Sequence, residues 1–215
     1  MLQRTLLLLV CGLAFLTSCQ ASSNTSKPVM LDSLSENGDK QEAIMAAGCF
    51  WCIESSLNLL DGVDTVISGY IGGQGKNPTY SQVTTGQTGY AEAVKITYDP
   101  SVISYDELLQ AFFQLHDPTQ LNRQGNDVGT QYRSALFPLN TEQKEKAEYY
   151  IKKLNAEKVY DKKIVTTIEK ANVFYPAEDY HQDYYNKNPN DRYCQFVVQP
   201  KMEKFKKVFA EKLKR

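Results

Sequence analysis

Hydrophobic and polar residues follow two spacings along the chain, and these spacings predict alternating strands and helices. A short, largely apolar run over 42–47 ends at Gly48 and predicts a buried strand. Residues 49–60 place apolar side chains one helical turn apart and stop at Asp61-Gly62, which predicts a helix. Residues 63–71 are typical of a second strand.

A long loop rich in Gly, Thr, Asn and Pro is expected over 72–89. The next strand is predicted over 91–98. In it, Ala91 and Ala93 alternate with Glu92, so that the alanines share one face and the glutamate has the other. This alternation alone would place Glu92 toward water, as a solvated strand residue.

The middle of the chain adds a helix, a strand and another helix. Ser104 is followed three residues later by Glu107, a capping-box pattern that predicts a helix start. A polar loop over 117–130 then leads into a predicted strand over 131–137, and a charged amphipathic helix is predicted over 140–159.

The last third of the chain predicts a strand over 163–169, a polar and aromatic segment over 175–190 and a final helix after Pro200. The complete order is roughly β-α-β, β-α-β, α-β. We therefore predict the α+β class: a two-layer sandwich with a split βαβ (ferredoxin-like) core, long functional loops and a C-terminal helix.

The first residues form a separate pattern. One basic residue, Arg4, precedes an apolar run over 6–16, and the run ends in Leu16-Thr17-Ser18-Cys19. This is typical of a secretory signal, and the run is too short for a bilayer, which needs about 20 apolar residues. The last four residues resemble a bacterial lipobox, which implies that Cys19 is lipidated. The alternative is an ordinary cleaved signal with an incidental cysteine.

We accordingly expect a lipoprotein signal peptide at 1–18, a flexible tether over 19–40 and a catalytic domain over 41–215. The tether is predicted because its Ser- and Asn-rich sequence has no apolar period. The expected location is the bacterial cell envelope, anchored to the membrane by lipid. Gln20 after Cys19 favours the outer membrane where the host has one.

Composition narrows the class of protein. The 215 residues are 42% hydrophobic and 23% charged, as is ordinary for a globular protein, and the formal net charge is −1. Nucleic-acid binding is not expected, because it normally requires a strong basic excess. The 14 tyrosines against one tryptophan suggest an aromatic site with polar ends or, alternatively, a tyrosine-rich surface.

Three of the five cysteines fall in the domain: Cys49, Cys52 and Cys194. Cys49 is expected to open a helix, where free N–H groups and a partial positive charge lower a thiol pKa, so it is the candidate nucleophile. Cys52 lies one turn further on. A structural disulfide and half of a zinc site are alternatives, but only one other Cys and two His exist to complete four zinc ligands.

Sequence blocks along most of the domain resemble one enzyme family. They are GCFWCIE at 48–54, SGYIGG at 68–73, NPTY at 77–80, TGYAEAV at 88–94, HDPT at 116–119, GNDVGTQYRS at 125–134 and FYPAEDYHQ at 174–182. In this order they resemble the methionine sulfoxide reductase A family, over nearly all of residues 42–200. Two departures are Tyr90, where several members have His, and the C-terminus, where many members have a Gly-rich tail with a further Cys.

The resemblance implies reduction of the S epimer of methionine sulfoxide to methionine, on oxidised proteins or peptides and without a metal or other cofactor. It implies that Cys49 is the nucleophile and that Glu92 is the proton donor. The implied substrate-binding residues are Phe50, Trp51, Tyr80, Asp127 and Tyr132. On the pattern alone these aromatic residues would be ordinary core or core edge. His116 and His181 are expected to be hydrogen-bonding residues rather than catalysts.

The resemblance also implies recycling through a disulfide and a thioredoxin-like reductant. We expect the chain to act as a monomer. Cys194 resembles the family's resolving cysteine, and Cys52 offers a second thiol. We expect Cys194, in a polar and mobile segment, to resolve Cys49 first and Cys52 to pass the disulfide outward. Two other functions remain open at this point: a general thiol–disulfide oxidoreductase, and a non-catalytic module that binds oxidised, methionine-rich surfaces.

Overall fold

The computed structural model describes residues 40–215. The predicted signal peptide, the lipidated Cys19 and the tether up to residue 39 lie outside the described residues. The central sheet has six strands: β1 (Gln41–Ala47), β2 (Val63–Ile71), β3 (Ala91–Tyr98), β6 (Ser134–Leu136), β7 (Thr167–Ile168) and β8 (Tyr175–Pro176). A separate two-stranded hairpin consists of β4 (Arg123–Gln124) and β5 (Asp127–Val128).

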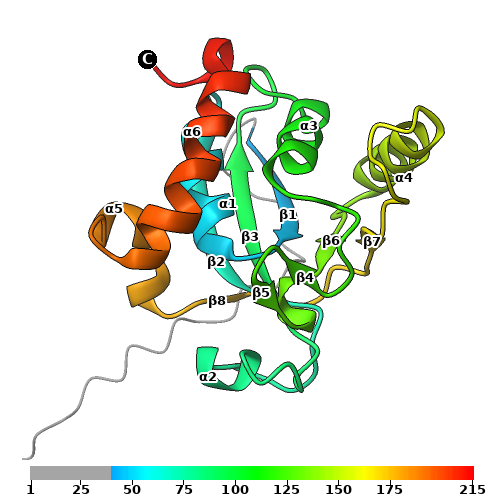
Figure 1. Cartoon of the computed structure of the whole chain (residues 1–215). Coiled ribbons are helices and arrows are strands. Elements are labelled where there is room, and N and C mark those ends of the chain that lie inside the picture. The colour runs from blue at the N-terminus through cyan, green and yellow to red at the C-terminus, as the bar shows by residue number, and fades with distance from the viewer. Residues whose placement is uncertain (1–39) are drawn as a thin grey trace, which may run out of the picture.

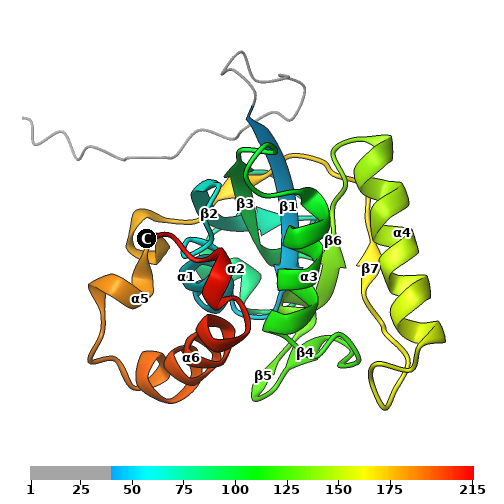
Figure 2. The same cartoon turned by 90° about the horizontal axis from the view of Figure 1, so that it is seen from above.

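Helices lie around this sheet (Figure 1). They are α1 (Phe50–Leu57), α2 (Tyr80–Val83), α3 (Tyr105–Leu115), α4 (Thr141–Ala156), α5 (Tyr184–Lys187) and α6 (Gln199–Val208). Helices α1 and α6 contact each other on one face of the sheet, and α4 lies beside β7, at the edge of the sheet that β7 forms (Figures 1 and 2). In the described part of the chain, no helix is long and apolar enough to cross a membrane.

The sheet is mixed, with the strand order β7-β6-β1-β3-β2-β8. Every neighbouring pair is antiparallel except β6 and β7. Since β3 lies between β1 and β2 and is antiparallel to both, α1 connects two parallel strands across β3. Helix α3 likewise connects β3 to β6 across β1. The predicted α+β class is confirmed.

Both faces of the sheet are buried, because helices cover one face and an irregular segment covers the other. Met45, Val94 and Ile96 face the helices and belong to the larger core cluster. Ile44 and Phe137 face the other way and pack with Phe174 in a second cluster. Strand β3 is therefore covered on both faces, which decides the environment of its polar residues.

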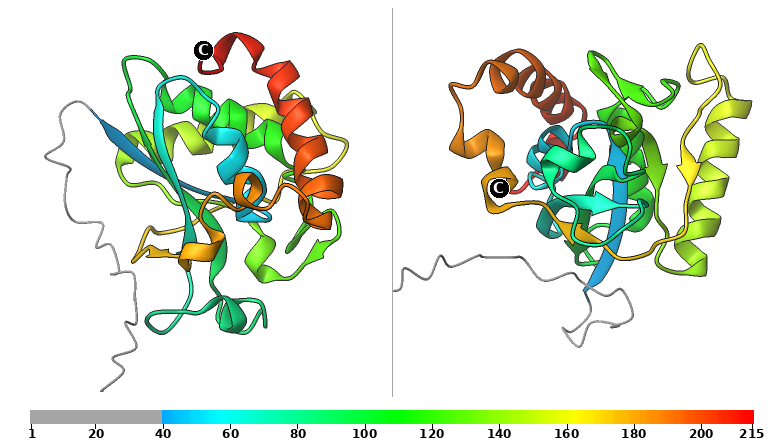
Figure 3. Two further views of the ribbon diagram at one scale, coloured as in Figure 1. Left: turned by 90° about the vertical axis from the view of Figure 1, so that its left-hand side faces the viewer. Right: turned by 90° about the horizontal axis from the view of Figure 1, so that it is seen from below.

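The second cluster depends on the connection between β7 and β8. These two strands are the opposite edges of the sheet, so residues 169–174 must cross its whole width. Figure 3 shows this segment passing beneath the strands. Phe174 lies at the end of this segment and is completely buried. Its ring packs against Gly69 of β2.

Several elements were predicted correctly from strand patterns and helix caps in the sequence. The strand over 63–71 is observed with those bounds. Ser104 caps α3, and both hydrogen bonds of the capping box with Glu107 are present. Asn140 caps α4 by accepting a hydrogen bond from the Gln143 N–H at 2.8 Å.

Three predicted elements were wrong or too long. The strand over 131–137 is reduced to Ser134–Leu136, because a 3₁₀ turn occupies Thr130–Tyr132. The strand over 163–169 pairs only at Thr167–Ile168, although the burial of its side chains does alternate. Cys194 was expected in a polar, mobile segment. Instead it is completely buried and begins a π-helical turn, Cys194–Val198, that continues into α6.

Candidate active site

Cys49 lies at the junction of β1 and α1, which a glycine makes possible. Gly48 has φ +88°, a backbone conformation that side chains with a Cβ rarely adopt. A Cβ at this position would also lie 2.7 Å from the Gln124 Cβ. The chain therefore turns sharply after the buried strand, and Cys49 becomes the N-cap residue of α1.

A pocket of about 340 Å³ opens at this junction. It brings together all the residues predicted to act on the substrate: Cys49, Phe50, Trp51, Tyr80, Glu92, Asp127 and Tyr132. Three further lining residues were not predicted, namely Tyr184, Asp191 and Tyr193. Cys52 and Cys194 do not line the pocket.

Glu92 is 1% exposed and points from β3 toward the start of α1. Its Oε2 accepts a hydrogen bond from the Phe50 N–H at 3.1 Å. Burial, together with negative charge on Cys49 and Asp127, raises the pKa of Glu92 well above its ordinary value, although the Phe50 N–H opposes the shift. The solvated placement that alternation suggested is wrong, because β3 is covered on both faces. A carboxyl in this setting is poised to hold and donate a proton.

Two tyrosine hydroxyl groups complete the polar side of the pocket. Burial raises the pKa of Tyr80 to about 12, with a further contribution from the charge of Glu92. Burial and Glu92 also raise the pKa of Tyr132. Both groups therefore remain hydrogen-bond donors at neutral pH. Both tyrosines line the same pocket as Glu92.

A half-buried carboxylate positions Tyr80. Glu178 accepts one hydrogen bond from the Tyr80 N–H and another from the Tyr70 hydroxyl, both at 2.8 Å. These bonds attach the first residue of α2 to the segment after β8. Glu178 was not singled out from the sequence, although it lies within the FYPAEDYHQ block.

Aromatic rings form the other side of the pocket. The Tyr184 ring stacks on Trp51 with centroids 3.7 Å apart. The Trp51 indole N–H donates to Nδ1 of His181 at 3.2 Å, and the Phe50 ring lies 5.0 Å from the His181 ring. His181 and Tyr184 thus fix the two predicted aromatic walls. Sequence reasoning did not assign them this position, since they follow Trp51 by more than 120 residues.

Tyr193 connects the pocket to the thiols. The Tyr193 hydroxyl donates to Oδ2 of Asp127 at 2.6 Å. The Tyr193 side chain also acts to lower the pKa of Cys49 and of Cys52. Asp127 comes from the β4–β5 hairpin and Tyr193 from the segment before α6. In the sequence, only the abundance of tyrosine indicated an aromatic side chain with a polar end at the site, as Tyr193 provides.

The two thiols of the CFWC segment affect each other's pKa, in opposite directions. Burial raises the pKa of Cys49 well above its ordinary value, and the contact with Cys52 adds to this. The same contact lowers the pKa of Cys52. The expectation that the helix start makes Cys49 the acidic thiol is therefore wrong, because removal from water outweighs the Trp51 N–H.

Two departures noted in the sequence have structural explanations. Tyr90 is buried, its ring lies against Gly73, and its hydroxyl donates to the Gly75 carbonyl at 3.1 Å, so it supports the loop before β3. At the C-terminus, α6 packs against α1 and takes the place of the Gly-rich tail.

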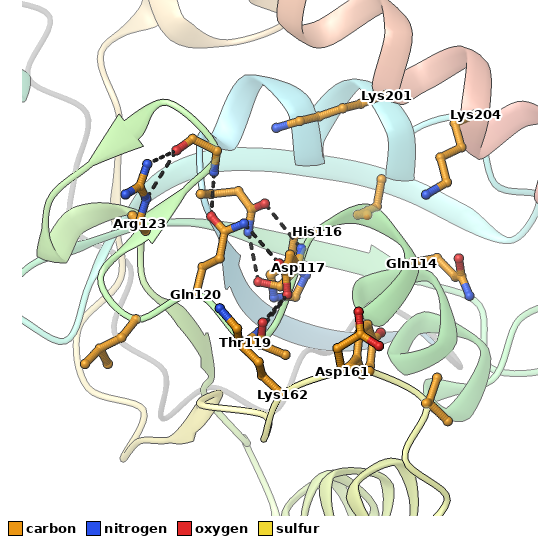
Figure 4. Close-up of a pocket in the computed structure, with 16 residues that line it drawn as sticks. Gln114, His116, Asp117, Thr119, Gln120, Arg123, Asp161, Lys162, Lys201 and Lys204 are labelled. Atoms are coloured by element: carbon orange, nitrogen blue, oxygen red, sulfur yellow. Dashed lines mark hydrogen bonds between the residues drawn. The ribbon is translucent and has the colours of Figure 1, made fainter.

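A larger hollow of about 970 Å³ lies on another side of the molecule, between α6, the β4–β5 hairpin and the segment after α4 (Figure 4). It contains no described cysteine. His116 at its floor is buried and hydrogen-bonded to the Phe112 carbonyl and the Ser134 hydroxyl, which confirms it as a hydrogen-bonding residue. Within residues 40–215, no cluster of three or more His, Cys, Asp or Glu side chains is arranged to hold a metal ion.

Comparisons with known proteins agree with this geometry. A family profile described as peptide methionine sulfoxide reductase matches residues 41–213. A peptide methionine sulfoxide reductase MsrA from Nitratiruptor sp. is 56% identical over 173 residues, covering 80% of this chain and 98% of the relative. The MsrA of Deinococcus radiodurans is 55% identical over 175 residues, covering 81% of this chain and 85% of the relative.

Two solved structures are also similar. Reduced Mxr1 from Saccharomyces cerevisiae has 37% identity and a TM-score of 0.66, covering 74% of this chain and 91% of that one. Methionine sulfoxide reductase A of Corynebacterium diphtheriae has 36% identity and a TM-score of 0.63, covering 75% of this chain and 81% of that one.

Proposed function

The chain belongs to the peptide methionine sulfoxide reductase family and reduces the S epimer of methionine sulfoxide to methionine, and from this premise we propose how its pocket performs that repair reaction. The alternatives of a general thiol–disulfide oxidoreductase and a non-catalytic binding module are set aside by this membership. The observation that carries the mechanism is the convergence of Cys49 and the buried Glu92 on one pocket.

In the first step the substrate methyl group lies between Phe50 and Trp51, where sulfur and methyl groups contact aromatic rings favourably. The Cys49 sulfur attacks the sulfoxide sulfur, and Glu92 protonates the sulfoxide oxygen. The oxygen is transferred to Cys49 and methionine leaves. The proton of the Cys49 thiol replaces the one that Glu92 donated, so one thiol and one sulfoxide give one sulfenic acid and one methionine.

Hydrogen bonds from Tyr80 and Tyr132 stabilise the negative charge that develops on the sulfoxide oxygen. Asp127 holds Tyr193 and thereby orders the side of the pocket next to the thiols. Water is excluded by the aromatic rings, which strengthens these interactions.

For recycling we propose the reverse of the order expected from the sequence. Cys52 resolves the Cys49 sulfenic acid first, and Cys194 acts second. This order is supported by the position of Cys52 in the first turn of α1, where its backbone N–H donates to the Cys49 carbonyl at 3.2 Å, and by the complete burial of Cys194. A thioredoxin-like dithiol then reduces the disulfide and restores the monomeric enzyme.

The test is an assay with the separated S and R epimers of a peptide methionine sulfoxide. The enzyme reduces the S epimer only, and Cys49→Ser loses this activity because a hydroxyl is a weak nucleophile without a dedicated base. The R epimer serves as the internal control. Turnover by Cys49→Ser at a rate near that of the parent would refute the role assigned to Cys49.

The cellular location is a separate proposal that follows from the N-terminal sequence. Lipidation of Cys19 anchors the enzyme to a membrane of the cell envelope, the outer membrane where there is one, and residues 20–40 act as the tether. Cys19→Ser then moves the protein from the membrane fraction to the soluble fraction. Equal membrane association of the two forms would refute the anchor.

A finer description of the fold is also proposed. Strands β1 and β2 with α1, and strands β3 and β6 with α3, form two interlocked split βαβ units, which corresponds to a ferredoxin-like core. The strand order β6-β1-β3-β2 supports this grouping.

A further inference from the structure

A lysine of the C-terminal helix contacts the second thiol of the CFWC segment. The Lys201 ammonium nitrogen lies 3.9 Å from the Cys52 sulfur. Lys201 comes from α6, which packs against α1, the helix that carries Cys52. Figure 4 shows Lys201 lying across α1, while Lys204 from the same helix points away from it into the hollow. Cys52 is only 5% exposed, whereas Lys201 is half-buried and lines the hollow, so the ammonium group approaches the buried sulfur from the side of the hollow.

The groups around Cys52 change its pKa in both directions. The neighbouring Cys49 thiol, the ammonium group of Lys201 and the nearby Tyr193 side chain lower the pKa of Cys52. Burial and the negative charge of Asp127 act in the other direction. Lys201 is the one cation among these neighbours, and it comes from the part of the chain where the sequence departs from many family members.

We propose that Lys201 is a positioning residue for recycling: its ammonium group holds the Cys52 sulfur as a thiolate beside Cys49 and so makes Cys52 the nucleophile that resolves oxidised Cys49. The inference rests on the proposed function, because it concerns the step that follows methionine release. A cation beside a cysteine favours the thiolate, which is the reactive form of the thiol.

The step balances without any further oxidant. The Cys52 thiolate attacks the sulfur of the Cys49 sulfenic acid, a sulfur–sulfur bond forms and the sulfur–oxygen bond breaks. Hydroxide leaves and takes up a proton to become water. The oxidising equivalent comes from the substrate sulfoxide, and the disulfide is later reduced by a dithiol reductant.

The position of Lys201 separates this task from catalysis. Lys201 lines the larger hollow and is not among the residues that line the substrate pocket. Lys201 can therefore stabilise the Cys52 thiolate without contacting the substrate. Glu92, in the substrate pocket, donates the proton to the sulfoxide oxygen. Replacement of Lys201 should change resolution and leave oxygen transfer intact.

The experiment compares Lys201→Met with Lys204→Met in the full chain. Methionine keeps the apolar stem of the lysine and removes its charge, and Lys204 is an exposed lysine one turn further along α6. Each enzyme is mixed with one equivalent of a peptide methionine S-sulfoxide. Methionine and the Cys49–Cys52 disulfide are then followed by acid quench, alkylation and peptide mapping across a pH series.

We expect Lys201→Met to form methionine at the parental rate and the disulfide about tenfold more slowly at pH 7, the effect of about one pKa unit. Disulfide formation should recover at higher pH, where Cys52 ionises unaided. Lys201→Arg should retain the parental profile, and so should Lys204→Met. An unchanged disulfide rate in Lys201→Met overturns the inference, and so does an equal loss at every pH.

A second measurement separates this inference from the proposed function. The alkylation rate of Cys52 by iodoacetamide is followed against pH in the substrate-free enzyme, again by peptide mapping. In Lys201→Met the midpoint should move to higher pH, and an unmoved midpoint overturns the inference. Absence of methionine formation in the parent would instead refute the proposed function, whatever the alkylation profile.

Discussion

The Phe50 backbone N–H donates a hydrogen bond to Glu92, and this bond joins the first residue of α1 to the middle strand that faces it. Burial raises the pKa of this carboxyl group, and the neighbouring Cys49 adds to the shift. One backbone donor therefore both positions the acid and limits how far its pKa rises.

Glu92→Gln should slow oxygen transfer by about 10²–10⁴-fold, the usual contribution of a positioned acid. The amide oxygen can still accept the Phe50 hydrogen bond, so the pocket should keep its shape and bind substrate. Single-turnover formation of methionine, measured at saturating substrate, reports the rate. A rate within a factor of two of the parent at pH 5.5 and pH 8 would contradict the role of Glu92 as the acid.

The same substitution should make the stability of the protein less dependent on pH. The pKa of Glu92 is raised in the folded state, so the folded protein retains a proton that the unfolded chain loses above its ordinary pKa near 4.5. The free energy of unfolding therefore falls as pH rises through this window.

Urea unfolding between pH 4.5 and pH 8 measures the effect. Glu92→Gln should lose this part of the decline and gain stability relative to the parent as pH rises. The exchange of exposed Glu203 for Gln is the control and should follow the parent. Parallel curves for the parent and Glu92→Gln would show that Glu92 is ionised in the folded protein.

Removal of the two pocket hydroxyl groups should slow the chemical step with little effect on folding. Tyr80→Phe and Tyr132→Phe should each lower the single-turnover rate by about 10–100-fold, and the double variant by about 10²–10³-fold, in the range known for oxyanion donors. Tyr149→Phe, an exposed tyrosine on α4, is the control. Unchanged rates in the double variant would mean that the oxygen is stabilised elsewhere.

The recycling order can be determined from two serine variants. Cys52→Ser should release one methionine per enzyme and accumulate the Cys49 sulfenic acid, since the nearest thiol is missing. Cys194→Ser should release one methionine and form the Cys49–Cys52 disulfide at the parental rate. Trapping with dimedone and peptide mapping distinguish these products. Accumulation of sulfenic acid in Cys194→Ser would restore the order that places Cys194 first.

Gly69→Ala should destabilise the fold by about 3 kcal/mol through overpacking. A Cβ at Gly69 would contact the Phe174 ring and lie 2.5 Å from the Tyr175 carbonyl oxygen, which the β2–β8 pairing holds in place. Gly75→Ala is the comparison, because nothing lies within 4 Å and only its positive φ opposes a side chain, at about 1 kcal/mol. Equal urea midpoints for the two variants would show that Phe174 can move aside.

Much of the fold follows from local signals, and the failures share a cause. Residues 63–71 and the capped start of α3 were predicted correctly, because alternation and caps act over a few residues. The strand over 163–169 was too long, since its pairing depends on β6, a three-residue strand that ends early. The turn at Cys194 was missed because its polar upstream sequence masks the apolar contacts that bury it.

The candidate site divides in the same way. The motif blocks assembled Cys49, Tyr80 and Tyr132 in one pocket, as the family resemblance implied. The burial of Glu92 could not come from alternation, because that pattern cannot report that a second layer covers the polar face. The acidity of Cys49 was misjudged for a related reason: the helix start is local, whereas desolvation depends on residues from the whole chain.

The two edge strands have a consequence for the behaviour of the protein in concentrated solution. Both β7 and β8 are only two residues long, and one connecting segment leads from one to the other. An exposed sheet edge offers unpaired N–H and C=O groups to strands of other molecules, and very short edge strands restrict that pairing. The two terminal strands therefore offer little template of their own for edge-to-edge aggregation, and the outer edge of β2 before Gly69, which β8 does not pair, is the longer template that remains.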